Sequence, residues 1–383
     1  MRPIRSLSLL APLFTLAACG LDPSKIAAHT LLADDGARLE RTDSVQFAVV
    51  GNPAGEGTPA LVSDLSNHLG GDEGLDFVVL MGGVVDSSSN RAWKQFSRTF
   101  EGVLAGPSAE GGVPAVPVAG AGEGNGDDVY RGWGAAFPGV GQDIGLNRVA
   151  SWYDFDLVTD GKTWRFLVMD ANRARLKSRW GEQLNWMKTA VEGEYDGLIV
   201  LFYDAPYSLA GATVTSQRAS APGDLLDALD AQIDETKLKA VFFAGPPANQ
   251  VLAPDGPYGA LYIGAGAGGV PLADLHREDP EDGAGEPLTL ESSYDGTMVE
   301  TVGKWSQAGL IEEKVVNEAR ALGEFEGRPR IVRGEAVPTT GWWEVKLNGT
   351  ALSVQLHLVQ PDGSYAPSWQ GVTRLGGPWT TVP

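Results

Sequence analysis

Short apolar runs alternate with amphipathic stretches from Val45 to about residue 270, and this pattern predicts alternating strands and helices. The apolar runs are rich in β-branched and aromatic residues and are bounded by Gly, Pro, Asn or Asp, as is typical of strands. We expect strands at Gln46–Val50, Phe77–Met81, Ala115–Ala119, Trp152–Val158, Trp164–Met169, Leu198–Phe202, Leu238–Phe243, Leu261–Ile263, Trp342–Leu347 and Leu352–Leu358.

Helical periodicity predicts five amphipathic helices, at about 58–69, 91–104, 179–192, 224–235 and 305–322. In the second helix, Trp93, Phe96 and Phe100 recur at three- and four-residue spacing and form one apolar stripe. We expect these aromatic side chains to pack in the core rather than to contact a ligand.

The order of these elements predicts a layered α/β (α+β) fold with mixed sheets, because paired strands close a chain that begins with alternating strands and helices. Asn348-Gly349 between two alternating runs is a strong hairpin signal and predicts a closing hairpin at about 341–358. Residues from about 270 to 300 are rich in Asp, Glu, Gly and Pro, which favours an acidic, solvated loop. We expect this loop to belong to a single domain that spans 45–383.

The first 18 residues have a basic start and an apolar run too short to span a bilayer, which indicates an export signal. The motif LAACG at 16–20 resembles a bacterial lipobox, in which the peptide is removed before the cysteine and the thiol is lipidated. We expect a signal peptide at 1–18, a lipid on Cys19 and a flexible tether at 19–44. Gly20, in place of Asp, favours the outer membrane of the cell envelope by resemblance to enteric sorting. The alternative is an ordinary signal peptide in which Cys19 is incidental.

The chain of 383 residues is strongly acidic, with 49 acidic and 29 basic side chains and a formal net charge of −20. This balance argues against nucleic acid as a partner, because little positive charge is available to neutralise phosphates. Cys19 is the single cysteine, so the chain cannot form an intramolecular disulfide. The partners we expect are the membrane, through the N-terminal lipid, and an envelope protein of unknown identity.

Several predicted strands end in glycine-rich turns, the places where α/β folds bind ligands. In order and spacing, the turns that begin at Gly51, Gly82, Gly120, Tyr203 and Gly245 resemble the motif loops of calcineurin-like metallophosphoesterases, including the purple acid phosphatase branch. The resemblance covers about 45–270 and 341–363. It implies a metallophosphoesterase-like β-sandwich of two mixed sheets flanked by helices, with a site for two metal ions bridged by a carboxylate.

The ligand positions of this family hold other residues in this chain. The D-x-H position falls on Asn52 and Ala54, and the bridging Asp of GDxxD falls on Gly83. The GNH position falls on Ala121 and Gly122, the single His on Tyr203, and the GHxH pair on Pro246 and Ala248. Acidic residues are kept at Asp86 and Glu123. Paired divalent ions need anionic and imidazole ligands, which Ala, Gly and Pro do not supply. We therefore expect no metal, no cofactor and no catalytic residue. We expect ordinary surface or packed roles for the four histidines, which all lie outside the motifs: His29, His68, His276 and His357.

These patterns predict a lipid-anchored pseudo-phosphoesterase that acts as a non-catalytic binding or scaffold protein of the envelope. One alternative is a metal-dependent phosphoesterase or hydrolase with a rebuilt acidic site, formed by Asp86, Glu123, Asp127, Asp128 and Asp204. Another is an unrelated α/β envelope protein. Aromatic anchors for a partner would come from among seven tryptophans, although we expect most of them to be structural: Trp133, Trp152, Trp180, Trp342, Trp343, Trp369 and Trp379.

Overall fold

The computed structural model describes most of the chain from residue 38 to residue 382. The described residues are 28, 30, 38–41, 43–70, 74–105, 112–123, 131–138, 140, 151–206, 221–245, 248–254, 260–269, 288–291, 331–337, 340–360, 362–375 and 380–382. The signal peptide, Cys19 and the helix expected at 305–322 lie outside them. In the described part of the chain, no helix is long and apolar enough to cross a membrane.

One sheet has seven strands in the order β16-β15-β14-β13-β2-β3-β4. Its strands are β2 (Val45–Val50), β3 (Phe77–Met81), β4 (Ala115–Val118), β13 (Gly341–Asn348), β14 (Ala351–Val359), β15 (Tyr365–Arg374) and β16 (Thr380–Val382). The first three are parallel, and the last four form an antiparallel meander that pairs with β2 through β13. The closing hairpin predicted at about 341–358 therefore extends the sheet that the first strands begin.

The other sheet has nine strands in the order β1-β5-β6-β7-β8-β10-β9-β12-β11. Its strands are β1 (Arg38–Arg41), β5 (Tyr153–Thr159), β6 (Lys162–Val168), β7 (Gly197–Leu201), β8 (Leu238–Phe243), β9 (Asn249–Pro254), β10 (Leu261–Ala265), β11 (Leu288–Glu291) and β12 (Ile331–Val337). Strands β6, β7, β8 and β10 are parallel neighbours. All residues of β7, β8 and β10 are buried, because both faces of a parallel sheet are covered.

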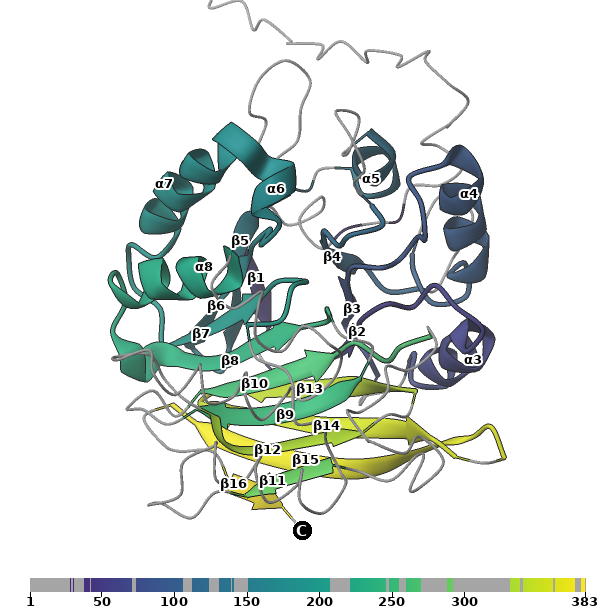
Figure 1. Ribbon diagram of the computed structural model, residues 1–383. Helices are drawn as coiled ribbons and strands as arrows, with labels where there is room; N and C mark the ends of the chain where they lie inside the picture. The colour runs from purple at the N-terminus through teal and green to yellow at the C-terminus, as the bar shows by residue number, and fades with distance from the viewer. Residues whose placement is uncertain are drawn as a thin grey trace, which may run out of the picture.

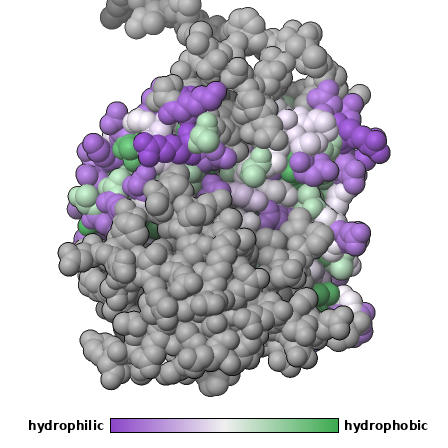
Figure 2. Space-filling view, in the orientation of Figure 1, coloured by the Kyte–Doolittle hydropathy of each residue, from purple (hydrophilic) through white to green (hydrophobic). Residues whose placement is uncertain are grey.

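The helices flank the two sheets on their outer sides (Figure 1). They are α3 (Thr58–Asn67), α4 (Asn90–Thr99), α5 (Arg131–Ala136), α6 (Arg173–Leu176), α7 (Trp180–Ala190) and α8 (Ala221–Asp230), with the 3₁₀ turns η1 (Lys177–Arg179) and η2 (Glu235–Lys237). Helices α3, α4 and α5 lie beside β2–β4, and α6, α7 and α8 lie beside β5–β8 (Figure 1). Figure 2 shows mainly hydrophilic residues over the outward sides of these two groups.

Aromatic rings from the two sheets meet at the centre of the sandwich. The Phe47 ring stacks on Phe77 within the seven-stranded sheet, with ring centroids 4.5 Å apart. It also meets Phe166 of the nine-stranded sheet edge-on at 5.8 Å, and Phe166 stacks on Phe155 at 4.6 Å. All four rings are buried, so this row of phenylalanines forms the centre of the sandwich core.

A second layer of core lies between the nine-stranded sheet and helices α7 and α8, and it includes Trp180 and Met187. The Arg165 guanidinium on β6 closes this layer at its edge. It forms two hydrogen bonds to the Asp156 carboxylate, at 2.8 and 2.9 Å. It also donates to the carbonyl oxygen of Ala190, the last residue of α7, and to that of Glu192, two residues further on. The end of the helix is thereby fixed to β5 and β6.

The structure confirms the predicted fold class of two mixed sheets flanked by helices. Each of the ten predicted strands is present within a few residues, as are the four predicted helices that fall on described residues. The stripe formed by Trp93, Phe96 and Phe100 is buried, as expected for core residues.

The tether predicted at 19–44 is corrected by the described residues of that segment. Strand β1 pairs in parallel with β5, and both Ala28 and Thr30 are buried. The Ala28 amide donates to Ala136 O at 2.8 Å, and Thr30 Oγ1 donates to Pro138 O at 3.1 Å. Backbone pairing does not require an apolar sequence, so the polar segment RLER joins the sheet without a periodic signal.

The acidic loop predicted at about 270–300 is also corrected in its described part, since Leu288–Glu291 form β11. Strands β9, β11, β12, β15 and β16 were not expected either. They lie in the outer part of each sheet, where a strand needs no continuous apolar run.

Candidate functional site

The glycine-rich turns at the carboxyl ends of the buried strands meet at one place in the sandwich. The turn after β2 is bonded to the turn after β3, because the backbone N–H of Asn52 donates to Gly82 O at 3.0 Å. It is also bonded to the turn after β10, through Gly268 N and Gly51 O at 2.9 Å. Carboxyl ends of parallel strands lie at the same edge of a sheet, so turns far apart in sequence converge here.

Asn52 is the residue that joins these turns through its side chain. Its side-chain nitrogen Nδ2 donates to Ala244 O at 2.7 Å and to Gly266 O at 3.0 Å. Its side-chain oxygen Oδ1 accepts from the Tyr203 hydroxyl at 2.9 Å. The backbone has φ +47°, a left-handed conformation that Asn tolerates well. The side chain is buried, and both amide hydrogens bond to protein oxygens.

Two glycines of the motif turns have no room for a ligand side chain. A Cβ at Gly83 would overlap Asn52 Oδ1 and lie 2.9 Å from Asn52 Cα, and Gly83 has φ +62°. A Cβ at Gly122 would overlap the Val85 carbonyl oxygen. The Tyr203 ring lies close by, because a Cβ at Gly82 would approach its Cδ2 to 2.5 Å. Neither a carboxylate at position 83 nor an imidazole at position 122 can enter without movement of the backbone.

Both carboxylate oxygens of Glu123 accept hydrogen bonds from backbone N–H groups. Its Oε1 accepts from Val84 N at 2.6 Å and from Val85 N at 3.4 Å, and its Oε2 accepts from Gly120 N at 2.9 Å. Burial raises the pKa of this carboxyl group, and the backbone donors act in the opposite direction. The retained acidic residue therefore ties the turn after β4 to the turn after β3.

The other motif positions differ in exposure and contacts. Ala54 N donates to Gly83 O at 3.2 Å, and the buried Ala248 accepts from Gly266 N at 3.1 Å. Ala121 is exposed, and its methyl group offers no ligand atom. Pro246 lies outside the described residues.

Three of the five acidic residues proposed for a rebuilt metal site lie among the described residues. Asp86 is exposed, Asp204 is half-buried, and Glu123 is buried. Asp127 and Asp128 lie outside the described residues. Among the residues that the structure describes, the only metal-competent group of three His, Cys, Asp or Glu side chains is Asp64, His68 and His357. The described acids at the motif turns are not part of such a group.

The residues of that group come from α3 and β14. Sequence reasoning missed it, because Asp64 and His68 are 289 or more residues from His357 and no motif links them. The i, i+4 spacing of Asp64 and His68 on a helix was the one available signal, and it fixes only two of the three positions. The pairing of β13 with β2 supplies the third.

Most of the tryptophans proposed as partner anchors are core residues. Trp133, Trp152, Trp180, Trp342 and Trp343 are buried, in agreement with the expectation that most of the seven tryptophans are structural. Trp369 is only half-buried and meets Trp343 edge-on at 5.7 Å, whereas Trp379 lies outside the described residues.

No family model matches this sequence, and no curated protein matches it. Among solved structures, the chain is similar to PhoD, with 11% identity and a TM-score of 0.52 over 89% of this chain and 72% of that one. It is also similar to the purple acid phosphatase PPD1 from seeds of yellow lupin (Lupinus luteus), with 13% identity and a TM-score of 0.51 over 87% of this chain. The chain spans about half of that phosphatase, 54%. These similarities show a metallophosphoesterase-like fold.

Proposed function

We propose that this protein is a lipid-anchored pseudo-phosphoesterase of the cell envelope. It has a metallophosphoesterase-like fold without the dinuclear metal site, and it acts as a non-catalytic binding or scaffold protein. The membrane holds it through a lipid on Cys19, and its partner is an envelope protein. The proposal places it at the outer membrane.

The observation that carries the proposal is the hydrogen bonding of Asn52. Where the resemblance places the first carboxylate ligand, an amide donates to the carbonyl oxygens of Ala244 and Gly266 and accepts from the Tyr203 hydroxyl. A metal ion requires a ligand lone pair directed at it. The amide nitrogen of Asn52 instead directs its hydrogen atoms toward two carbonyl oxygens, and its oxygen accepts from the Tyr203 hydroxyl. The turns are thereby bonded to one another at the place where two ions would lie.

The close packing at Gly83 and Gly122 supports the same proposal. These are the positions of the bridging carboxylate and of one imidazole in the family to which the sequence bears a resemblance. A side chain at either one would overlap Asn52 Oδ1 or Val85 O. Two divalent ions without such ligands have neither charge compensation nor a means of activating water.

Hydrolysis of aryl phosphate monoesters and diesters tests the loss of catalysis. The full chain with Cys19→Ser, assayed from pH 5 to pH 9 with Mn²⁺, Zn²⁺, Fe²⁺, Mg²⁺ or Ca²⁺, is expected to give no turnover above the metal-only rate. Turnover that Asp86→Asn, Glu123→Gln or Asp204→Asn abolishes would overturn the proposal and establish the rebuilt acidic site.

Membrane fractionation tests the anchor. Cys19→Ser is expected to move the protein from the membrane fraction to the soluble fraction and to end incorporation of labelled palmitate. Gly20→Asp is the matched control, because it keeps the lipidated cysteine and changes only the residue after it. That variant should remain in the membrane and shift from the outer to the inner fraction. A Cys19→Ser protein that still fractionates with membranes would refute the lipid anchor.

A further inference from the structure

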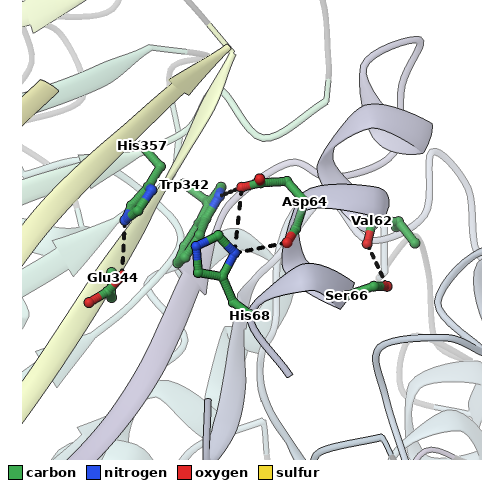
Figure 3. A network of polar contacts seen from close by, with 7 residues as sticks. All are labelled: Val62, Asp64, Ser66, His68, Trp342, Glu344 and His357. Carbon is green, nitrogen blue, oxygen red and sulfur yellow. Dashed lines mark hydrogen bonds and ion pairs between the residues drawn. The ribbon is translucent and has the colours of Figure 1, made fainter. Parts of the chain in front are cut away.

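Asp64, His68 and His357 form a side-chain cluster where α3 meets the β13–β14 hairpin (Figure 3). Asp64 and His68 lie one turn apart, at the C-terminal end of α3 and just after it. His357 on β14 lies opposite Trp342 on β13 in the hairpin register. One ligand atom from each member lies within 4.8 Å of the others. The cluster is built from different residues than the motif turns and does not depend on them.

Each imidazole in the cluster bonds to an oxygen through one of its two nitrogens. His68 Nδ1 lies 2.9 Å from the Asp64 carbonyl oxygen, and His357 Nε2 lies 3.0 Å from Glu344 Oε2. In a neutral ring, the nitrogen that faces an oxygen carries the hydrogen, so His68 Nε2 and His357 Nδ1 keep their lone pairs. Metal-binding histidines are oriented in this way, with the second ring nitrogen donating to a carbonyl or carboxylate.

The indole of Trp342 fixes the geometry of the cluster. Its Nε1 donates to Asp64 Oδ2 at 2.7 Å, and its ring stacks on His357 with centroids 4.3 Å apart. The His68 ring meets both rings edge-on, at 5.1 Å from Trp342 and 5.3 Å from His357. Figure 3 shows the two imidazoles and the Asp64 carboxylate gathered around this indole. The contacts with Trp342 thus fix Asp64 and His357 in place before any ion binds.

The charge and exposure of the cluster favour a cation. Two carboxylates, Asp64 and Glu344, lie beside two imidazoles, so a divalent ion would offset their negative charge. The side chains of His357 and Asp64 are 7% and 14% exposed, whereas His68 is 31% exposed and faces the solvent side. An ion can therefore reach the cluster past His68.

A buried hydroxyl group that has no hydrogen-bond partner in the described part of the chain is influenced by the charge of the same carboxylate. Tyr365 Oη is buried and has no hydrogen-bond partner among the described residues. Burial raises the pKa of Tyr365, and the nearby negative charge of Asp64 adds to this effect. A buried polar atom without a partner is costly, and a water bound to an ion at Asp64 would give it one.

We propose that Asp64, His68 and His357 bind one zinc-class divalent ion that links α3 to the β13–β14 hairpin. Two imidazoles and one carboxylate suit Zn²⁺, Ni²⁺ or Cu²⁺ and not Mg²⁺ or Ca²⁺, which prefer oxygen ligands. The His68 nitrogen nearest to the Asp64 carboxylate is Nδ1, 3.9 Å from Oδ2. Ligands of one zinc ion lie about 3.3 Å apart, so the half-exposed His68 ring turns as well as moves inward to bind through Nε2. Three protein ligands leave the fourth position to water.

Zinc binding to the full chain with Cys19→Ser tests this site, with a chromophoric chelator as competitor and the bound metal counted by mass spectrometry. We expect one Zn²⁺ per chain, not displaced by millimolar Mg²⁺ or Ca²⁺. His68→Ala and His357→Ala should each weaken binding more than about 100-fold, and Glu344→Gln about 10–100-fold. His276→Ala is the matched control, because it removes a histidine that is not one of the three proposed ligands and should leave the affinity unchanged.

The thermal unfolding midpoint of the chain with the three ligands intact gives a second readout, because the effects of Zn²⁺ and of the chelator on it require no ligand variant to fold. Zn²⁺ should raise it, the chelator should reverse the rise, and His68→Ala should abolish the shift. Absence of Zn²⁺ binding at 100 µM, or binding that His68→Ala and His357→Ala leave unchanged, would overturn the site. Neither result concerns catalysis, so phosphoester turnover remains the separate test of the proposed function.

Discussion

Replacement of Asn52 by Asp restores the carboxylate that the metallophosphoesterase motif has at this position, and we expect it to destabilise the fold. The substitution removes two hydrogen bonds, to Ala244 O and Gly266 O, and puts a negative oxygen against both carbonyl groups. Asn52 is only 5% exposed, so water does not compensate. The lost bonds contribute about 1 kcal/mol each, and an uncompensated buried charge brings the expected loss to about 3–5 kcal/mol.

Urea unfolding followed by tryptophan fluorescence measures this loss in the full chain with Cys19→Ser. The matched control is Asn67→Asp, the same chemical change at an exposed position at the end of α3, with an expected cost of about 0.5 kcal/mol. The Asn52→Asp deficit should shrink at low pH, because a protonated carboxyl group carries no charge. An Asn52→Asp protein within about 1 kcal/mol of the parent, or one that Mn²⁺ restores to the parent's stability, would refute the reasoning.

Two further predictions concern the core and the closing hairpin. Phe166→Ala removes the ring that meets Phe47 across the sheets and stacks on Phe155, and it should cost about 3–5 kcal/mol in the same unfolding assay; a loss below about 1 kcal/mol would contradict the face-to-face core. The hydrogen bond from His357 lowers the pKa of Glu344 below its usual value near 4.5. A carboxyl group of lowered pKa stabilises the fold above the unfolded-state pKa and loses this contribution as the pH falls through the folded-state pKa. Glu344→Gln should therefore reduce the thermal midpoint more at pH 6 than at pH 3, and an equal reduction at both would contradict the pairing.

Burial of both sheet faces explains why the central strands were predictable. Strands β7, β8 and β10 are covered on both sides and read as apolar runs, interrupted only by Lys239 in β8. Strand β15 has several exposed residues and includes Pro367 and Gly371, so its sequence resembles a loop. Its place in the sheet depends on backbone pairing with β14, which leaves no sign in side-chain hydrophobicity.

The candidate site was predictable in its position and not in its contacts. Glycine-rich turns after successive strands indicated where the chain would converge, since carboxyl ends of parallel strands share an edge. The motif spacing placed Asn52, Gly83 and Glu123 at these turns. It did not indicate that Asn52 bonds to Ala244 or that Glu123 bonds to Val84. Those partners are 192 and 39 residues away, and only folding brings them near.

By itself, the sequence determined the alternation of elements, the fold class and which chemical groups lie at the motif turns, because these depend on local periodicity and composition. Only the tertiary structure decided that β1 joins the domain and that His68 meets His357. The reason is that backbone pairing and side-chain contacts between distant segments depend on sheet order. The pairing of β13 with β2 brings residues near 64 and near 357 to one place, and no local pattern in the chain specifies that pairing.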